Sequence, residues 1–83
     1  MYYVYALKSL KDGKYYFGHT HDPLKRLEKH NTGQVISTKR RRPFHLVGYK
    51  EFNARNEASW YEHMLKKHGD RKVKFLKELG ITK

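Results

Sequence analysis

With 83 residues and no cysteine, the chain is expected to fold as a single domain over residues 1–83, without a disulfide framework or a thiolate zinc site, which fits a reducing compartment. Nineteen lysines and arginines against eight acidic residues give a formal charge of +11, which predicts a polyanionic partner, nucleic acid well before an anionic membrane surface. No apolar run is long enough to span a membrane and the first residues lack the order of a signal peptide, so we expect a cytoplasmic protein.

The first 20 residues predict a β-hairpin. Tyr2–Lys8 and Lys14–His19 are rich in aromatic and β-branched residues, and the Asp12-Gly13 pair between them is a strong turn signal. These two runs contain five tyrosines, which either fill a small core or carry chemistry.

Two registers of this hairpin are open. A two-residue loop sets Tyr5 opposite Thr20, whereas a four-residue loop sets it opposite Gly18. Both registers put Tyr5 and Tyr16 on the same face of the sheet. In the second register, Gly18 is expected to leave an open space beside the Tyr5 ring, where a substrate backbone approaches.

The next segment predicts a helix over residues 23–31. Asp22 is a good N-cap, and Pro23 suits the first helical position. Leu24 and Leu27 supply an apolar stripe, and Gly33 offers a left-handed stop. After a polar loop, residues 44–52 have the composition of a third strand, which begins after a proline.

Two further helices are predicted in the last 30 residues. The first is capped by Asn53, ends at Gly69 and presents one inward face, made of Ala58, Tyr61 and Leu65. The second is capped by Asp70, is closed by Gly80 and carries three apolar residues, Val73, Leu76 and Leu79. The element order ββαβαα predicts an α/β fold of the α+β sandwich type, a small three-stranded antiparallel sheet flanked by helices.

Five segments in the same order resemble the GIY-YIG nuclease superfamily, whose fold is a small antiparallel sheet flanked by helices. They are VYAL at 4–7, YFG at 16–18, DPLKRLEKHNTG at 22–33, STKRRRPFHLVGYKEF at 37–52 and NEASWYEHMLKK at 56–67. The resemblance is to the URI type, similar to the amino-terminal domain of an excision-repair nuclease and to small stand-alone bacterial proteins.

The resemblance assigns roles residue by residue. It makes Tyr5 and Tyr16 the active-site tyrosines, Gly18 the tight-packing glycine, Arg26 the phosphate contact and Glu62 the protein ligand of one divalent ion, Mg²⁺ or Mn²⁺. His19 follows the glycine where some members place a lysine.

The chemistry of these residue types agrees with those roles. Arg26 and His30 are four residues apart, so they project from the same face of the predicted helix, where one can bind phosphate oxygens and the other can accept a proton. Glu62 lies at the edge of the inward face of its helix, and Glu57 is the rival carboxylate. A single carboxylate suffices for Mg²⁺, which keeps several waters and binds substrate phosphate.

The implied reaction is metal-assisted hydrolysis of a DNA phosphodiester, in repair or processing, with Tyr5 as the candidate base and His30 as a further proton acceptor. Lys25 and the run Lys39, Arg40, Arg41 and Arg42 are expected to bind phosphates without reading bases. With no second DNA-binding domain, specificity would come from DNA structure or from a protein partner. The alternative is a nucleic-acid-binding module that retains the fold without catalysis.

Overall fold

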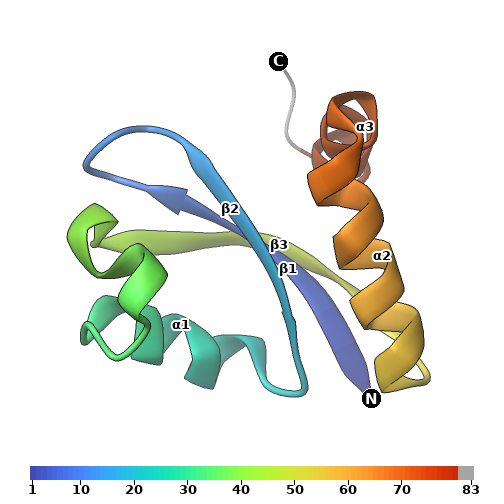
Figure 1. Cartoon of the computed structure of the whole chain (residues 1–83), viewed down its shortest axis with the longest axis horizontal. Helices are drawn as coiled ribbons and strands as arrows, with labels where there is room; N and C mark the ends of the chain where they lie inside the picture. The colour runs from blue at the N-terminus through green and yellow to red at the C-terminus, as the bar shows by residue number, and fades with distance from the viewer. Residues whose placement is uncertain (81–83) are drawn as a thin grey trace.

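A computed structural model describes residues 1–80, and Figure 1 shows a three-stranded antiparallel sheet between two helical layers. The strands lie in the spatial order β2-β1-β3 and are β1 (Tyr2–Ser9), β2 (Tyr15–Thr20) and β3 (Phe44–Phe52). The helices are α1 (Pro23–Asn31), the short 3₁₀ helix η1 (Ile36–Arg41), α2 (Arg55–Lys67) and α3 (Gly69–Glu78). The predicted fold class and the order ββαβαα are confirmed, and η1 is an addition where a loop was expected.

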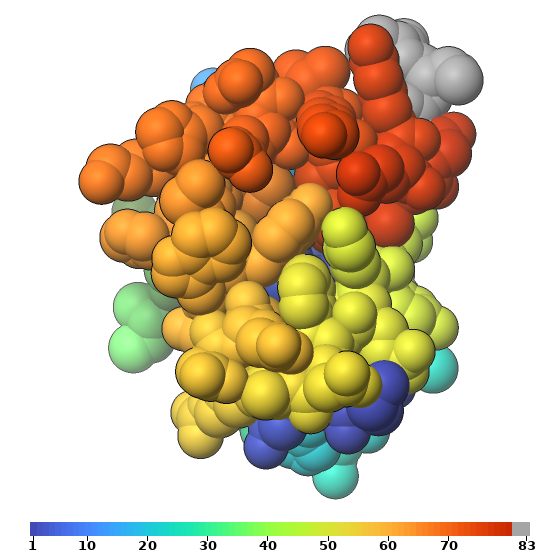
Figure 2. Space-filling model, turned by 90° about the vertical axis from the view of Figure 1, so that its right-hand side faces the viewer, coloured from blue at the N-terminus to red at the C-terminus, as the bar shows by residue number. Residues whose placement is uncertain are grey.

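The central strand β1 is covered on both faces. Its residues Val4–Leu7 are all buried, and alternation along the strand sends Tyr5 and Leu7 toward α1 and Val4 and Ala6 toward α2 and α3. Figure 2 shows α2 and α3 (orange to red) as a large part of the surface on their side of the molecule. In residues 1–80, no helix combines the length and the apolar character that crossing a membrane requires.

The core is divided between these two faces. On the α2–α3 side, the largest buried group is Phe75, which packs with Phe17 at a ring separation of 6.0 Å. On the α1 side, Tyr5 and Leu7 pack with Phe44. The second cluster is small and includes Tyr5. The Tyr5 side chain therefore contributes to the packing of this cluster and is also the one that would carry any chemistry.

The hairpin adopts the register with a four-residue loop. Tyr5 lies opposite Gly18, and the loop is closed by a hydrogen bond from the Ser9 N–H to the Lys14 carbonyl, 2.9 Å long. The alternative pairing of Tyr5 with Thr20 is therefore wrong. The longer loop is stabilised by the Ser9 hydroxyl, which accepts hydrogen bonds from the backbone N–H groups of residues 11 and 12, each 3.1 Å long.

Helix α1 has the predicted bounds, but its buried face differs from the prediction. The Asp22 carboxylate accepts from the Lys25 N–H and caps the helix. Leu24, expected on the apolar stripe, is 70% exposed, whereas His30 is fully buried. The helix is turned so that Leu27 and His30 face the sheet, because the His30 ring finds hydrogen-bond partners there.

Two predicted helix caps are wrong. Helix α2 is preceded by Ala54, not capped by Asn53, and the Glu57 carboxylate accepts from the Ala54 N–H at 3.3 Å. Helix α2 ends at Lys67, so Gly69 begins α3 and Asp70 lies inside its first turn, where a negative charge favours the helix N-terminus.

The inward faces of these helices agree with the prediction only in part. Ala58 and Leu65 of α2 are buried as expected. In α3, however, Val73 is exposed and Phe75 is the fully buried residue. Leu76 and Leu79 do pack against the core, so local spacing was wrong for Val73 and missed Phe75 as the main anchor.

Gly18 is required by the close approach of the Tyr5 ring. A Cβ added at residue 18 would contact the Tyr5 hydroxyl and lie 2.6 Å from Tyr5 Cζ. The expected open space for a substrate backbone is therefore wrong, because the ring of Tyr5 itself occupies the position beside Gly18.

We predict that Gly18→Ala lowers the free energy of unfolding by about 1–3 kcal/mol, because the added methyl overpacks a buried ring. Gly69→Ala is the matched control, since nothing lies within 4 Å of its added Cβ. Urea denaturation of the two variants measures the difference. Equal stability of Gly18→Ala and the wild type would contradict the close packing described here.

Candidate active site

Tyr5 is the buried centre of the site. Its side chain is 1% exposed, and its hydroxyl lies 3.0 Å from His30 Nε2. Burial raises the pKa of Tyr5 to about 12, with further contributions from Tyr16 and Glu62, while hydrogen bonding and charge from Arg26 act in the opposite direction. Tyr5 is therefore protonated at neutral pH, and four of the predicted site residues lie close enough to affect it.

His30 holds the α1 side of this cluster together. Its ring packs edge-on against Tyr5 and Tyr16, with centroid separations of 5.9 and 5.1 Å. Burial, and then the charge of Arg26, lower the pKa of His30 to about 4. The imidazole is therefore neutral at pH 7 and keeps one nitrogen free to accept a proton.

A partly buried cation, Arg26, reaches the same place from α1. Arg26 Nε is buried without a hydrogen-bond partner among residues 1–80. Arg26 also lines a cleft of about 520 Å³. A buried guanidinium nitrogen without a partner beside an open cleft suits an incoming anion such as a phosphate.

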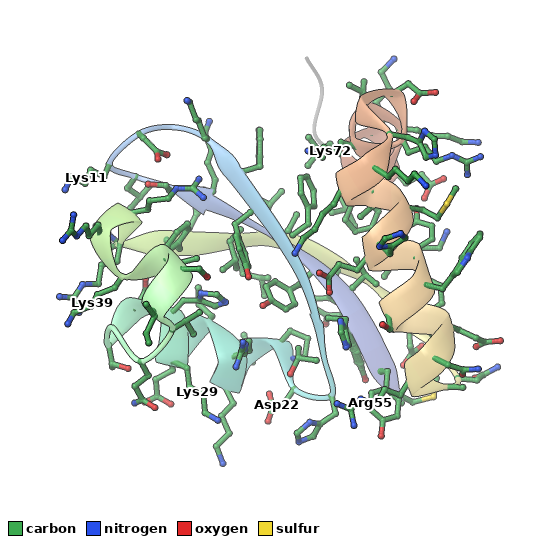
Figure 3. The ribbon with its side chains drawn as sticks, viewed as in Figure 1. Lys11, Asp22, Lys29, Lys39, Arg55 and Lys72 are labelled. Atoms are coloured by element: carbon green, nitrogen blue, oxygen red, sulfur yellow. The ribbon has the colours of Figure 1, made fainter. Side chains whose placement is uncertain are left out.

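The cleft itself is rich in positive charge. Lys25, Lys29 and Arg55 line it, and its one carboxylate, Asp22, is already used to cap α1. In Figure 3, Asp22 and Lys29 lie along α1 and Arg55 lies near the start of α2. The cleft is therefore bordered by both helical layers and reaches Arg26.

Glu62 approaches from α2, on the other face of the sheet. Its side chain is 15% exposed; Oε1 lies 2.5 Å from His19 Nδ1 and Oε2 lies 2.7 Å from Lys66 Nζ. Burial tends to raise the pKa of Glu62, but hydrogen bonds from Lys66 and His19 outweigh it and hold the pKa below its ordinary value. The carboxylate is therefore ionised at neutral pH.

The two layers meet at the edge strand β2. Lys66 Nζ, bound to Glu62, also lies 5.4 Å from the centre of the Tyr16 ring. Tyr16 faces α1 and His19 faces α2, so side chains reach around β2 from both sides. This edge brings Tyr5, Tyr16, Arg26, His30 and Glu62 into one region of the molecule.

Glu57, the rival carboxylate, lies elsewhere. It is exposed at the start of α2, where it accepts the Ala54 N–H. Glu62, by contrast, is close enough to influence Tyr5. Among residues 1–80, no group of three or more metal-binding side chains is present, so an ion here would rely on Glu62, water and substrate.

The predicted nucleic-acid-binding residues fall in two places. Lys25 lines the cleft, whereas Lys39, Arg40, Arg41 and Arg42 lie in or directly after η1. Within this run, Arg41 is held by Asp12 at 2.8 Å and is not a free cation. The other three are exposed, and in Figure 3 Lys39 lies on the opposite side of the view from Arg55.

Three residues around the site had no assigned role in the sequence prediction. His19 and Lys66 hold the Glu62 carboxylate, and Thr38 lies 2.7 Å from His30 Nδ1. The spacing of Glu62 and Lys66, four residues apart on a helix, was a usable signal. Neither the His19 nor the Thr38 contact has a local signal, because each joins segments distant in sequence.

Comparisons with known proteins identify the family of the chain. A family model described as the GIY-YIG catalytic domain matches residues 1–74. A UPF0213 protein of Pediococcus pentosaceus is 36% identical over 83 residues, covering 98% of this chain and 86% of the relative. A UPF0213 protein of Staphylococcus aureus is 38% identical over 78 residues, covering 92% of this chain and 94% of the relative.

A solved structure supports the same grouping. The solution NMR structure of a UPF0213 protein from Bacillus halodurans matches with a TM-score of 0.54 and 38% identity, covering 95% of this chain and 85% of that one. The family model matches most of the chain, and the two relatives are 36% and 38% identical to it. The protein belongs to the GIY-YIG catalytic domain family.

Proposed function

We propose that this protein is a divalent-metal-dependent endonuclease that hydrolyses DNA phosphodiester bonds. The observation that carries the proposal is the meeting of Tyr5, Tyr16, Arg26, His30 and Glu62 at the edge of β2. Two tyrosines, a neutral imidazole, a guanidinium and an ionised carboxylate provide proton acceptors, a phosphate contact and a metal ligand in one place. Membership of a family of catalytic domains and the charge of +11 support the same function.

Arg26 binds the phosphate in this proposal. Its unpartnered Nε and its place on the basic cleft suit contact with a non-bridging oxygen. Lys25 and Lys29, one turn apart on α1, would extend the contact to a neighbouring phosphate. This arrangement holds the strand by its backbone, so binding depends little on base sequence.

Glu62 would hold the metal. An ionised, partly buried carboxylate is a suitable oxygen ligand for Mg²⁺ or Mn²⁺. When bound, the ion supplies positive charge that stabilises the leaving oxygen. His19 and Lys66 each contact one carboxylate oxygen, so an ion would use a remaining lone pair of Glu62 or displace one of these two partners.

Tyr5 and His30 together would accept the proton of the attacking water. A phenol with a pKa of about 12 is ionised in only about one molecule in 10⁵ at pH 7. Tyr5 therefore has to lose its own proton as it takes one from water, and His30 Nε2, 3.0 Å away, is positioned to receive it. Negative charge developing on the phosphate stabilises the imidazolium formed.

Tyr16 is the second candidate for contact with the water. It is partly exposed and packs on the same His30 ring, but in residues 1–80 no hydrogen bond from its hydroxyl is found. Its hydroxyl would orient the water or contact the phosphate. The rival function, a module that binds nucleic acid without cleaving it, requires the same basic surface but not an ionised Glu62.

The first test is Glu62→Gln, assayed with single-stranded, duplex and branched DNA in Mg²⁺ or Mn²⁺. We expect cleavage to fall to background, because the amide keeps the shape but loses the charge that binds the ion. Glu57→Gln is the matched control and should cleave at the wild-type rate. Cleavage that persists in Glu62→Gln would refute its role, and binding without any cleavage by the wild type would favour the non-catalytic module.

A second test separates the two tyrosines. In single-turnover assays, Tyr5→Phe should slow cleavage by about 10²- to 10⁴-fold, the usual contribution of a positioned proton acceptor. Tyr16→Phe should have a smaller effect. Because Tyr5→Phe leaves His30 Nε2 without its partner, a loss of about 1–3 kcal/mol in stability is expected, so folding is checked by circular dichroism. A near wild-type rate in Tyr5→Phe would assign Tyr5 to the core alone.

A third test concerns the basic run after Thr38. Replacing Lys39, Arg40 and Arg42 by glutamine should make the plot of log DNA affinity against log salt concentration less steep. The slope should fall in magnitude by up to about 0.9 for each phosphate contact that is lost. Arg41 is left intact because it holds Asp12. Glutamines at Lys67, Lys74 and Lys77 make the same charge change on the other helical layer and should leave the slope unaltered. Equal slopes in both triple variants would exclude the basic run as a phosphate contact.

A further inference from the structure

Among residues 1–80, Thr38 is the one buried polar side chain near the site that neither the family resemblance nor the proposed mechanism uses. It lies on η1 with no exposed surface, and its Oγ1 is 2.7 Å from His30 Nδ1. The same hydroxyl donates to the Val35 carbonyl at 3.3 Å. A threonine hydroxyl has one proton, so if Val35 receives it, the oxygen must accept from His30.

The direction of this hydrogen bond determines the tautomer of His30. The neutral ring carries a single N–H. With that proton on Nδ1, facing Thr38, the other nitrogen, Nε2, accepts from the Tyr5 hydroxyl. The positive charge of Arg26 lies close enough to the Tyr5 oxygen to favour negative charge there. Donation then runs in one direction, from Tyr5 through His30 and Thr38 to the Val35 carbonyl.

The opposite direction leaves a proton without an acceptor. If Thr38 donated to Nδ1, the ring proton would sit on Nε2 and point at the Tyr5 oxygen. The Tyr5 proton would then lack an acceptor, because among residues 1–80 His30 is the one hydrogen-bond partner found for this hydroxyl. Because Tyr5 is buried, an unsatisfied hydroxyl there is unfavourable, and the first direction is preferred.

Thr38 is held in place by the anchoring of η1 to the hairpin. The Ser9 hydroxyl donates to the Arg41 carbonyl at 2.5 Å, and Lys11 Nζ donates to the Arg40 carbonyl at 3.1 Å. The Arg41 side chain binds Asp12. These contacts fix η1 from its C-terminal end, so the position of the Thr38 oxygen does not depend on α1 alone.

We propose that Thr38 is a positioning residue, which holds His30 as the Nδ1–H tautomer and so keeps Nε2 available to the Tyr5 hydroxyl. The effect of this tautomer on catalysis rests on the proposed function. Thr38 touches neither substrate nor reacting atoms and acts through His30. Without its oxygen, His30 is free to carry its proton on Nε2, where it can no longer accept the proton of Tyr5.

The tautomer is measured directly from the ¹⁵N shifts and long-range ¹H–¹⁵N couplings of the His30 ring, in the full chain at pH 7 without metal or DNA. We expect a protonated Nδ1 and an unprotonated Nε2 in the wild type. Thr38→Ser should keep this pattern, whereas Thr38→Val, of similar shape but without the hydroxyl, should shift proton occupancy to Nε2. Thr32→Val, an exposed threonine that follows α1, is the control and should leave the pattern unchanged.

A wild-type ring protonated on Nε2 would overturn the proposal, and so would an unaltered tautomer in folded Thr38→Val. If Thr38→Val does not fold, the spectra of the wild type and of Thr38→Ser still show which ring nitrogen of His30 carries the proton. In single-turnover cleavage, Thr38→Val should be slower by roughly 10²-fold with unchanged DNA affinity, and Thr38→Ser should restore the rate. Because the spectra need no reaction, absence of cleavage by the wild type would contradict the proposed function and leave the tautomer assignment standing.

Discussion

The packing of the Tyr5 ring against Gly18 is the constraint on which the rest of the site depends. Tyr5 belongs to the central strand and is enclosed by both neighbouring strands and α1, so its ring fits only where β2 has no side chain. In that position its hydroxyl meets His30, and the His30 ring in turn contacts Tyr16 and Thr38. A larger residue at 18 would displace the hydroxyl and every group arranged around it.

The site also shows how a domain of this size combines folding with chemistry. Tyr5 and His30 are fully buried, Tyr5 within one of two small core clusters and His30 against its rings, yet they are the proposed proton acceptors. Glu62 comes from the opposite helical layer and meets them only because β2 is an edge strand. A central strand would have been covered by a neighbour on both sides, and the two layers could not share a site there.

The sequence predicted those parts of the fold that depend on local chemistry. Asp22, Pro23 and Gly33, a residue with a φ of 81°, delimit α1 because each acts within one turn of the helix end. Burial of His30 in place of Leu24 was not predictable from spacing, because it depends on Tyr5 and Thr38, 25 and 8 residues away. The failed Asn53 cap has a local cause, since α2 begins one residue later than expected, after Ala54, whose N–H donates to the Glu57 carboxylate.

Binding of Mn²⁺ distinguishes the proposed metal site at the edge of β2 from a site elsewhere on the molecule. The protein is titrated with Mn²⁺ in the presence of DNA bearing non-hydrolysable linkages, and paramagnetic broadening of its amide resonances is followed by NMR. Our account predicts broadening centred on His19 and Glu62, with Tyr16 and Arg26 affected next and Glu57 spared. Broadening centred on Glu57, or spread evenly over the acidic residues, would contradict it.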